Sequence, residues 1–283
     1  MLVRVKNYNV IKQSLDKDDS LHGLQFTHEM KKYCGTTQRI LTEVIRVKSD
    51  GRGYEKNIGI LEDVYMLDNV FCNGERHLNC TRQCKLLWHK DWLDFKNSSK
   101  TVEPLSNKSP LLIDDPTVCQ ASTIMNAATR FSNKFYQNLL NREYFSKVSV
   151  SDVIKDILNG VSYIITTYIW SRKGSLRRTP SANLGLKVGD RVRVRSFEEI
   201  KRTLDVYGRN RGLGFSAEMR KYCGQTLTVS YIMRNVISEY TGELKRASNT
   251  VLLEGSICDG EYHSRCQRQC PHMWREIWLE RTQ

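Results

Sequence analysis

One module is written twice in this sequence, and the duplication constrains the fold more than any other feature. The motif Phe-x-x-Glu-Met-x-Lys-Tyr-Cys-Gly at 26–35 recurs at 215–224. A second motif, Cys-x-Gly-Glu-x-His-x-x-Cys-x-Arg-Gln-Cys, spans 72–84 and recurs at 258–270. The offset between copies is 189 residues in the first motif and 186 in the second, so one net gap of three lies between the motifs. Two copies that have diverged elsewhere kept these positions, which marks them as residues the module requires.

The pattern within the C-terminal copy predicts short strands. Residues 189–195 alternate apolar and charged side chains with a period of two, which is typical of a strand. A short amphipathic helix is expected at 197–204, and further strands at 227–232, 249–257 and 274–279. Several curved strands in so short a module are typical of a small, partly open, SH3-like β-barrel. The predicted fold class is therefore mainly β with a helical connector (α+β), with two repeated SH3-like modules.

Three segments follow from the repeat and from the prolines. Four of the five prolines fall between the copies and favour extended junctions there. We expect a cysteine-rich barrel at 1–95, a helical connector at 96–183 and a second barrel at 184–283.

The connector predicts helices at 118–131, 135–145 and 149–171. The last of these is uncharged from 160 to 170 and is followed by four basic residues. Two interpretations stay open for 149–178: a helix packed between the modules, or a helix lying in a membrane interface with its basic end at anionic headgroups.

Charge does not favour nucleic-acid binding. The formal net charge is +13, but it divides into +2 for 1–95, +6 for 96–183 and +5 for 184–283. A module that reads DNA is expected to carry a dense basic face in both copies. A nucleic-acid-binding protein is therefore kept only as an alternative.

Cysteine usage indicates metal chemistry. The sequence has no run of eighteen apolar residues, which a membrane-spanning helix would need. Residues 1–6 already belong to the first copy and do not have the pattern of a signal peptide. We therefore expect a cytoplasmic protein, at most peripheral to a membrane. In that compartment nine cysteines are interpreted as metal ligands or reactive thiols before disulfides, and pairing within each module is the alternative.

Each copy offers five donors for a tetrahedral zinc ion, which takes four. We expect first a ligand set of four thiolates in each copy. The histidine then either lies next to the ligands or takes the place of the Tyr-Cys-Gly cysteine. An iron–sulfur cluster is an alternative to zinc, because four thiolates can hold either group. Two other interpretations also stay open: buried cysteines that bind no metal, and a catalytic thiol. The expected ligands are Cys34, Cys72, His77, Cys80 and Cys84 in the first copy and Cys223, Cys258, His263, Cys266 and Cys270 in the second.

Other repeated side chains have structural interpretations. The tryptophan pairs Trp88/Trp92 and Trp274/Trp278 are expected in the barrel cores. Arg82 and Arg268 are candidates for binding a phosphate or carboxylate, although hydrogen bonds to thiolates or backbone are the favoured alternative.

The C-terminal copy resembles a family of bacterial single- or tandem-module proteins. The resemblance is carried by Tyr-Cys-Gly at 222–224, the Cys-x-Gly turn, Cys-x-Arg at 266–268 and Trp-Arg-Glu-Ile-Trp-Leu at 274–279. The first copy departs from it, since Asp91 stands where Ile277 stands in the second. Members are encoded among glycosyltransferase, polysaccharide or specialised-metabolite genes, so the resemblance implies a biosynthetic context and no particular activity.

These observations predict a non-catalytic, metal-stabilised tandem scaffold that binds a protein partner or an anionic biosynthetic intermediate, with one zinc in each module. The alternative is a metal- or thiol-dependent enzyme, which would need an open coordination position or a thiol of depressed pKa.

Overall fold

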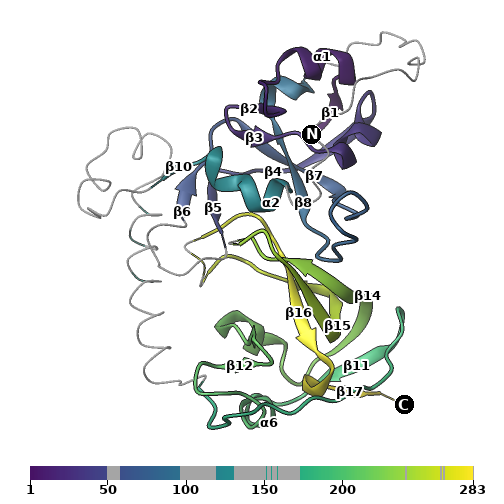
Figure 1. Ribbon diagram of the computed structural model, residues 1–283, viewed down its shortest axis with the longest axis vertical. Helices are drawn as coiled ribbons and strands as arrows, with labels where there is room; N and C mark the ends of the chain where they lie inside the picture. The colour runs from purple at the N-terminus through teal and green to yellow at the C-terminus, as the bar shows by residue number, and fades with distance from the viewer. Residues whose placement is uncertain are drawn as a thin grey trace. The chain divides into compact units, whose positions relative to one another are not determined.

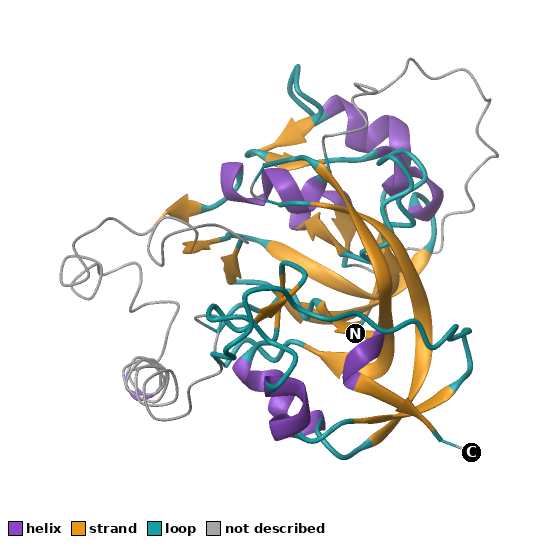
Figure 2. Ribbon diagram, turned by 60° about the horizontal axis from the view of Figure 1, so that its bottom comes forward, coloured by secondary structure: helices purple, strands orange, loops and turns teal. Residues whose placement is uncertain are grey.

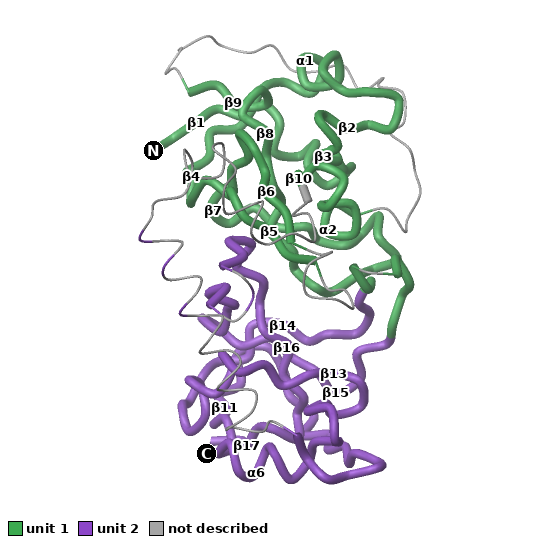
Figure 3. The backbone as a smooth tube through the Cα atoms, turned by 90° about the vertical axis from the view of Figure 1, so that its left-hand side faces the viewer, with its two compact units in different colours: residues 1–138, 237–245 green, residues 139–236, 246–283 purple. Residues whose placement is uncertain are grey.

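A computed structural model of the chain describes residues 1–49, 58–95, 119–130, 151, 154, 158, 173–239, 241–261, 263 and 265–282. The protein is mainly β, with a curled half-barrel sheet and few helices (Figures 1 and 2). The chain divides into two compact units (Figure 3). Unit 1 comprises 1–138 and 237–245, and unit 2 comprises 139–236 and 246–283. The segment 237–245, which belongs to the second copy in sequence, is therefore part of unit 1.

Unit 1 is built on a five-stranded sheet in the order β8-β7-β4-β1-β9, whose paired strands are antiparallel. Its strands are β1 (Leu2–Val5), β4 (Thr37–Glu43), β7 (Val64–Phe71), β8 (Lys85–His89) and β9 (Leu93–Asp94). A three-stranded sheet is formed by β5 (Arg46–Lys48), β6 (Ile58–Ile60) and β10 (Thr129–Arg130). The remaining elements are α1 (Tyr8–Gln13), β2 (Ser20–Leu21), β3 (Leu24–Gln25), η1 (His28–Tyr33), η2 (Lys90–Trp92), α2 (Gln120–Thr123) and η3 (Ile124–Asn126).

Unit 2 has a five-stranded sheet in the corresponding order, β16-β15-β14-β11-β17. Its strands are β11 (Arg191–Val194), β14 (Thr226–Ile237), β15 (Leu244–Ile257), β16 (Pro271–Arg275) and β17 (Leu279–Arg281). The other elements are α6 (Phe197–Lys201), β12 (Arg209–Asn210), β13 (Leu213–Gly214), η4 (Ala217–Tyr222) and η5 (Glu276–Trp278). The matched strand order agrees with the sequence repeat, while the SH3-like assignment stays a prediction.

The predicted closing strand at 274–279 is wrong. The chain leaves β16 at Arg275, makes the single turn η5 and continues as β17. β16 pairs with β15 at one edge of the sheet and β17 with β11 at the other. One turn can join both edges only where the sheet curls and brings them together, which explains why a straight strand does not form here.

Each core contains one phenylalanine and two tryptophans whose rings all pack against one another edge-on. The Phe26 ring meets Trp88 and Trp92 edge-on, with centroids 6.2 and 5.3 Å away. Phe215 meets Trp274 and Trp278 in the same way, at 6.1 and 5.5 Å. All four tryptophans are fully buried, and edge-to-face packing of this kind adds about 1 kcal/mol per pair to the gain from burial. The tryptophan pairs are core residues.

The connector predictions have mixed outcomes. Of the helix expected at 118–131, the structure has only α2 and η3, and residues 129–130 form β10 instead. Ile124 of η3 is 1% exposed and belongs to the unit 1 core. The helix expected at 135–145 lies outside the described residues. So does the one at 149–171, except for residues 151, 154 and 158, which are helical.

Candidate metal centre

The duplicated cysteine loop has the same backbone in both units. In unit 1 the Cys72 N–H donates to the Cys84 carbonyl at 2.8 Å, which closes the loop at its base. Gly74 has a φ of +74°, and a Cβ there would lie 1.9 Å from the Cys80 carbonyl oxygen. Glycine is therefore required, because it adopts this φ freely and lets the loop fold back on itself. The fold-back places Cys72 and His77 close together in space, while the sulfur atoms of Cys80 and Cys84 lie outside the group that these two form with Glu29.

Unit 2 repeats these features. The Cys258 N–H donates to the Cys270 carbonyl at 2.8 Å. Gly260 has a φ of +80°, and its Cβ would lie 2.3 Å from the Cys266 carbonyl oxygen. The glycine of the Cys-x-Gly sequence, which both copies share, is therefore required by the backbone conformation of this loop.

A glutamate from the other repeated motif joins the cysteine and the histidine in each unit. The carboxylate comes from the short helical turn η1 or η4. One donor atom from each residue lies within 4.8 Å of the others. The two groups are Glu29, Cys72 and His77 in unit 1 and Glu218, Cys258 and His263 in unit 2.

The unit 1 group is buried, and its carboxylate and imidazole face each other. Glu29 and His77 are each 4% exposed, and the carboxylate Oε2 lies 3.1 Å from the imidazole Nε2. Burial raises the pKa of the Glu29 carboxyl, but the interaction with His77 outweighs it and the pKa falls to about 2. Burial and the Glu29 charge raise the pKa of the Cys72 thiol to about 12. Oε2 and both His77 nitrogens find no well-aligned hydrogen-bond partner in the described structure, although buried polar atoms rarely lack one.

In unit 2 the donors approach more closely. The His263 Nδ1 lies 2.8 Å from Oε1 of Glu218 and 3.5 Å from the Cys258 sulfur. A second histidine, His272, places its Nε2 3.4 Å from the same Oε1. Although burial opposes it, the contacts with these two histidines hold the pKa of the Glu218 carboxyl well below its usual range. Burial, followed by the charge of Glu218, raises the pKa of the Cys258 thiol.

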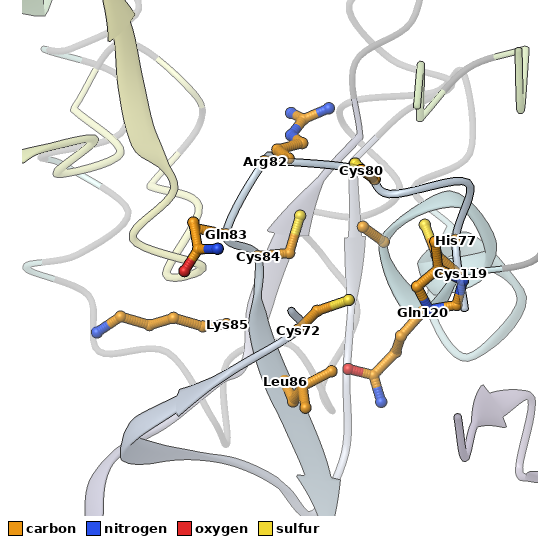
Figure 4. Close-up of a pocket in the computed structure, with 11 residues that line it drawn as sticks. Cys72, His77, Cys80, Arg82, Gln83, Cys84, Lys85, Leu86, Cys119 and Gln120 are labelled. Carbon is orange, nitrogen blue, oxygen red and sulfur yellow. The ribbon is translucent and has the colours of Figure 1, made fainter. Parts of the chain in front are cut away.

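A cavity of about 20 Å³ lies against the unit 1 group, with room for one water-sized occupant. Figure 4 shows the side chains that line it. The residues with sulfur or imidazole donors at its wall are Cys72, His77, Cys80, Cys84 and Cys119.

The Tyr-Cys-Gly cysteines stand outside these arrangements. The Cys34 sulfur lies 3.9 Å from the Met30 carbonyl, and the residue packs against the unit 1 core rather than lining the cavity. Cys223 packs against the unit 2 core in the same way. Burial raises the pKa of both thiols, that of Cys34 to about 12. The structure therefore does not bring these two cysteines to the donors of the second motif.

No disulfide joins any of the nine cysteines, all of which lie in the described residues. Several functional candidates were missed from sequence. Glu29 and Glu218 lie in the duplicated first motif and could have been found there. His272 and Cys119 have no counterpart in the other copy, since Leu86 aligns with His272, so duplication gave no signal for either.

Arg82 faces a carboxylate of the protein itself. Its Nη2 lies 3.0 Å from Oε1 of Glu239, and the two side chains are 11% and 2% exposed. Glu239 belongs to the segment 237–245 of unit 1. The adjacent Ile237 N–H donates to the Cys80 sulfur at 3.4 Å. This segment therefore contacts the cysteine loop at two points. Arg268, the counterpart in unit 2, is 6% exposed.

Comparisons of the chain with protein-family models, with curated proteins and with solved structures give no match. In the described parts of the chain, none of the helices combines the length and the apolar character that crossing a membrane requires.

Proposed function

We propose that this chain is a non-catalytic tandem binding protein in which each unit is stabilised by one zinc ion. The observation that carries the proposal is the pair of matching Glu–Cys–His groups. They are built from the same two motifs in both copies, and in unit 1 they contain buried polar atoms that an ion would satisfy.

The donors assigned to the ion are those of the duplicated second motif. This segment supplies three thiolates and one imidazole in each unit, a set that suits zinc and fills its four positions. In unit 1 all four line one cavity, and of these four Cys72 and His77 belong to the group whose donor atoms lie within 4.8 Å of one another. Glu29 and Glu218 then orient the histidines, whose imidazole nitrogens lie 3.1 and 2.8 Å from the carboxylate oxygens. The assigned ligands are Cys72, His77, Cys80 and Cys84, and Cys258, His263, Cys266 and Cys270.

The thiols favour a structural site over a catalytic one. A nucleophilic cysteine needs a depressed pKa, whereas burial raises the pKa of Cys72 and of Cys258. Binding of a dication stabilises the thiolate and releases the protons to solvent. The site therefore contributes to folding free energy, which suits small units with few helices.

The biological role proposed for this scaffold is to bind a protein partner or an anionic intermediate in a cytoplasmic biosynthetic assembly. The modest charge of each module supports this role over nucleic-acid binding. A salt titration against duplex and single-stranded oligonucleotides separates the two, because phosphate-driven affinity falls steeply with salt.

The deciding experiment is elemental analysis with an absorption spectrum on anaerobically purified full chain. We expect two zinc per chain, no visible absorption, and a fall in melting temperature on chelation that added zinc reverses. A matched pair of variants sharpens the result: Cys266→Ser removes one zinc, and Cys223→Ser removes none. Metal-free protein with an unchanged melting temperature would overturn the proposal. A brown protein containing iron would replace zinc with an iron–sulfur cluster.

A further inference from the structure

The final residues of the expected connector pack against the hairpin β12–β13 of unit 2 and against the loop that leads into it. Leu176 forms a bridge with Asp205 in that loop. Three residues later, Oγ1 of Thr179 accepts a hydrogen bond from the Arg211 N–H at 2.8 Å. The two stretches of chain therefore lie side by side, and residues from both reach the same part of the unit 2 surface.

Four arginines lie where these stretches meet, and all four are exposed: Arg177, Arg178, Arg209 and Arg211. Within the described residues, no carboxylate forms an ion pair with any of them. The acidic side chain of the loop, Asp205, is turned to the backbone instead. Its Oδ1 accepts from the N–H groups of residues 207 and 209, at 2.8 and 2.9 Å. The positive charge of the four guanidinium groups is therefore left for a partner.

Two apolar side chains stand beside these arginines at the tip of the loop. Tyr207 is 77% exposed and Val206 is 49% exposed. The Arg209 guanidinium lies over the Tyr207 ring, 6.0 Å from its centroid. We refer to Val206, Tyr207 and the four arginines as the arginine–tyrosine patch. It presents a cationic and an apolar surface together.

The first copy shows that the backbone of this loop does not require these side chains. Asp16, the counterpart of Asp205, accepts from the N–H groups of residues 18 and 20, both at 2.9 Å, and so forms the same turn. His22 has a φ of +51° and its counterpart Arg211 one of +47°. Where unit 2 has Val206, Tyr207, Arg209 and Arg211, unit 1 has Lys17, Asp18, Ser20 and His22. The turn folds with either set, so folding alone does not explain the patch.

The chemistry of the patch fits an anionic lipid surface. Arginines are attracted to the phosphates of anionic headgroups, and tyrosine is enriched at membrane–water interfaces, where its ring meets the apolar side and its hydroxyl the polar side. An exposed valine gains nothing from a phosphate or a nucleic-acid backbone, but it gains from burial among headgroups. The stretch 160–170, which precedes these arginines in the sequence, also contains no charged residue.

We propose that the arginine–tyrosine patch binds the anionic headgroups of a lipid surface and holds unit 2 at a membrane. The four arginines contact the phosphates, while Tyr207 and Val206 enter the interface. This inference goes beyond the proposed function and does not depend on a bound ion. It also gives a role to the basic residues at the end of 149–178, which pack on unit 2 through their backbone and keep their side chains exposed.

The test is flotation of the full chain with vesicles of phosphatidylcholine, either alone or mixed with phosphatidylglycerol. We expect binding to the mixed vesicles only, and we expect salt to weaken it by screening the headgroup charge. The first copy supplies the variant, Val206→Lys/Tyr207→Asp/Arg209→Ser/Arg211→His, which gives the unit 2 turn the side chains of unit 1. It removes two net positive charges and the exposed apolar groups. Since each basic residue near an anionic surface contributes about fivefold, binding should weaken about 25-fold.

Lys187→Ser/Arg191→Ser is the matched control, because it also removes two exposed positive charges from unit 2 but lies outside the patch. It should bind the mixed vesicles as the unmodified chain does. Both variants should keep the melting temperature and zinc content of the unmodified chain, because the altered side chains are exposed.

Three results would overturn the inference: equal binding by the two variants, equal binding to neutral and anionic vesicles, or no binding to either. Binding of an oligonucleotide that the four-residue variant abolishes, without vesicle binding at the same salt concentration, would assign the patch to nucleic acid instead. A chain that contains no zinc but binds anionic vesicles would overturn the proposed function and leave this inference standing.

Discussion

Glu29 and His77 form a buried pair in unit 1, with 3.1 Å between Oε2 and Nε2. Glu218 and His263 form the corresponding pair in unit 2, at 2.8 Å. The two residues of each pair come from different motifs, 48 residues apart in the first copy and 45 in the second. Each glutamate also accepts a hydrogen bond from a backbone N–H of the cysteine loop, that of Arg76 at 3.2 Å for Glu29 and that of Asp259 at 3.3 Å for Glu218, so polar contacts as well as packing tie η1 or η4 to the loop.

The first prediction tests this contact. Glu218→Gln should weaken zinc binding at unit 2 by about 10- to 100-fold, as loss of an orienting carboxylate generally does. The measurement is competition with a chromophoric chelator. Glu280→Gln is a matched control, because Glu280 pairs with Arg193 on the unit 2 surface. An unchanged affinity in Glu218→Gln would show that the carboxylate does not orient a ligand.

The second prediction concerns the glycine of the loop. Gly260→Ala places a Cβ 2.3 Å from the Cys266 carbonyl in a backbone conformation with φ of +80°. We expect a loss of more than about 2 kcal/mol in unfolding free energy, together with loss of the unit 2 metal. Gly255→Ala is the control: its φ is +70° but no atom lies within 4 Å, so only about 1 kcal/mol of strain applies. Equal losses in the two variants, measured by urea unfolding, would rule out the close approach as the reason for glycine.

The third prediction concerns the buried Arg82–Glu239 pair. Arg82→Met leaves the Glu239 carboxylate buried without this partner, which should destabilise unit 1 by about 3 kcal/mol. Removing the second charge as well, in Arg82→Met/Glu239→Gln, should recover a large part of that loss. A double-mutant cycle on unfolding free energies measures the coupling. Additive losses would show that the two side chains act independently.

The sequence predicted the mainly β character and the tryptophan cores, because alternation and repeated large apolar residues report burial directly. The sequence did not predict the turn η5. One continuous strand and two shorter strands joined by a turn have the same pattern of apolar residues. Only the pairing partners at the two sheet edges distinguish them.

The candidate site was predictable in part, for a similar reason. The second motif contains its candidate donors within one short segment, and the loop built on Gly74 or Gly260 brings its first cysteine and its histidine together. Cys34 was expected with them because it is duplicated, but a duplicated cysteine can equally be a core residue, and its packing places it there. Cys119 could not be found from spacing, because the bonds of Gln120 to β8 are long-range contacts that no local pattern encodes.

The last prediction is a pH dependence outside the cysteine loops. His89 is 7% exposed, and its Nδ1 accepts a hydrogen bond from the Asp91 N–H at 3.2 Å. Burial lowers the pKa of His89, and the nearby His22 also lowers it, while the Asp91 and Asp63 carboxylates oppose the shift. A histidine whose folded pKa lies below its unfolded value of 6.5 stabilises the fold fully above pH 6.5. That stability is lost as the pH falls below 6.5, because protonation charges a buried ring and removes the acceptor at Nδ1.

His89→Asn keeps an acceptor suited to this N-cap position but cannot titrate. The variant should be less stable than the unmodified chain at pH 7.5, because the ring also packs against Trp92. The difference should narrow as the pH falls to 5.5, since only the unmodified chain loses stability through His89. Both proteins contain the same cysteine loops, so the difference between their urea-unfolding free energies cancels any acid sensitivity of bound zinc. A difference that stays constant or widens toward pH 5.5 would mean that His89 does not become harder to protonate on folding.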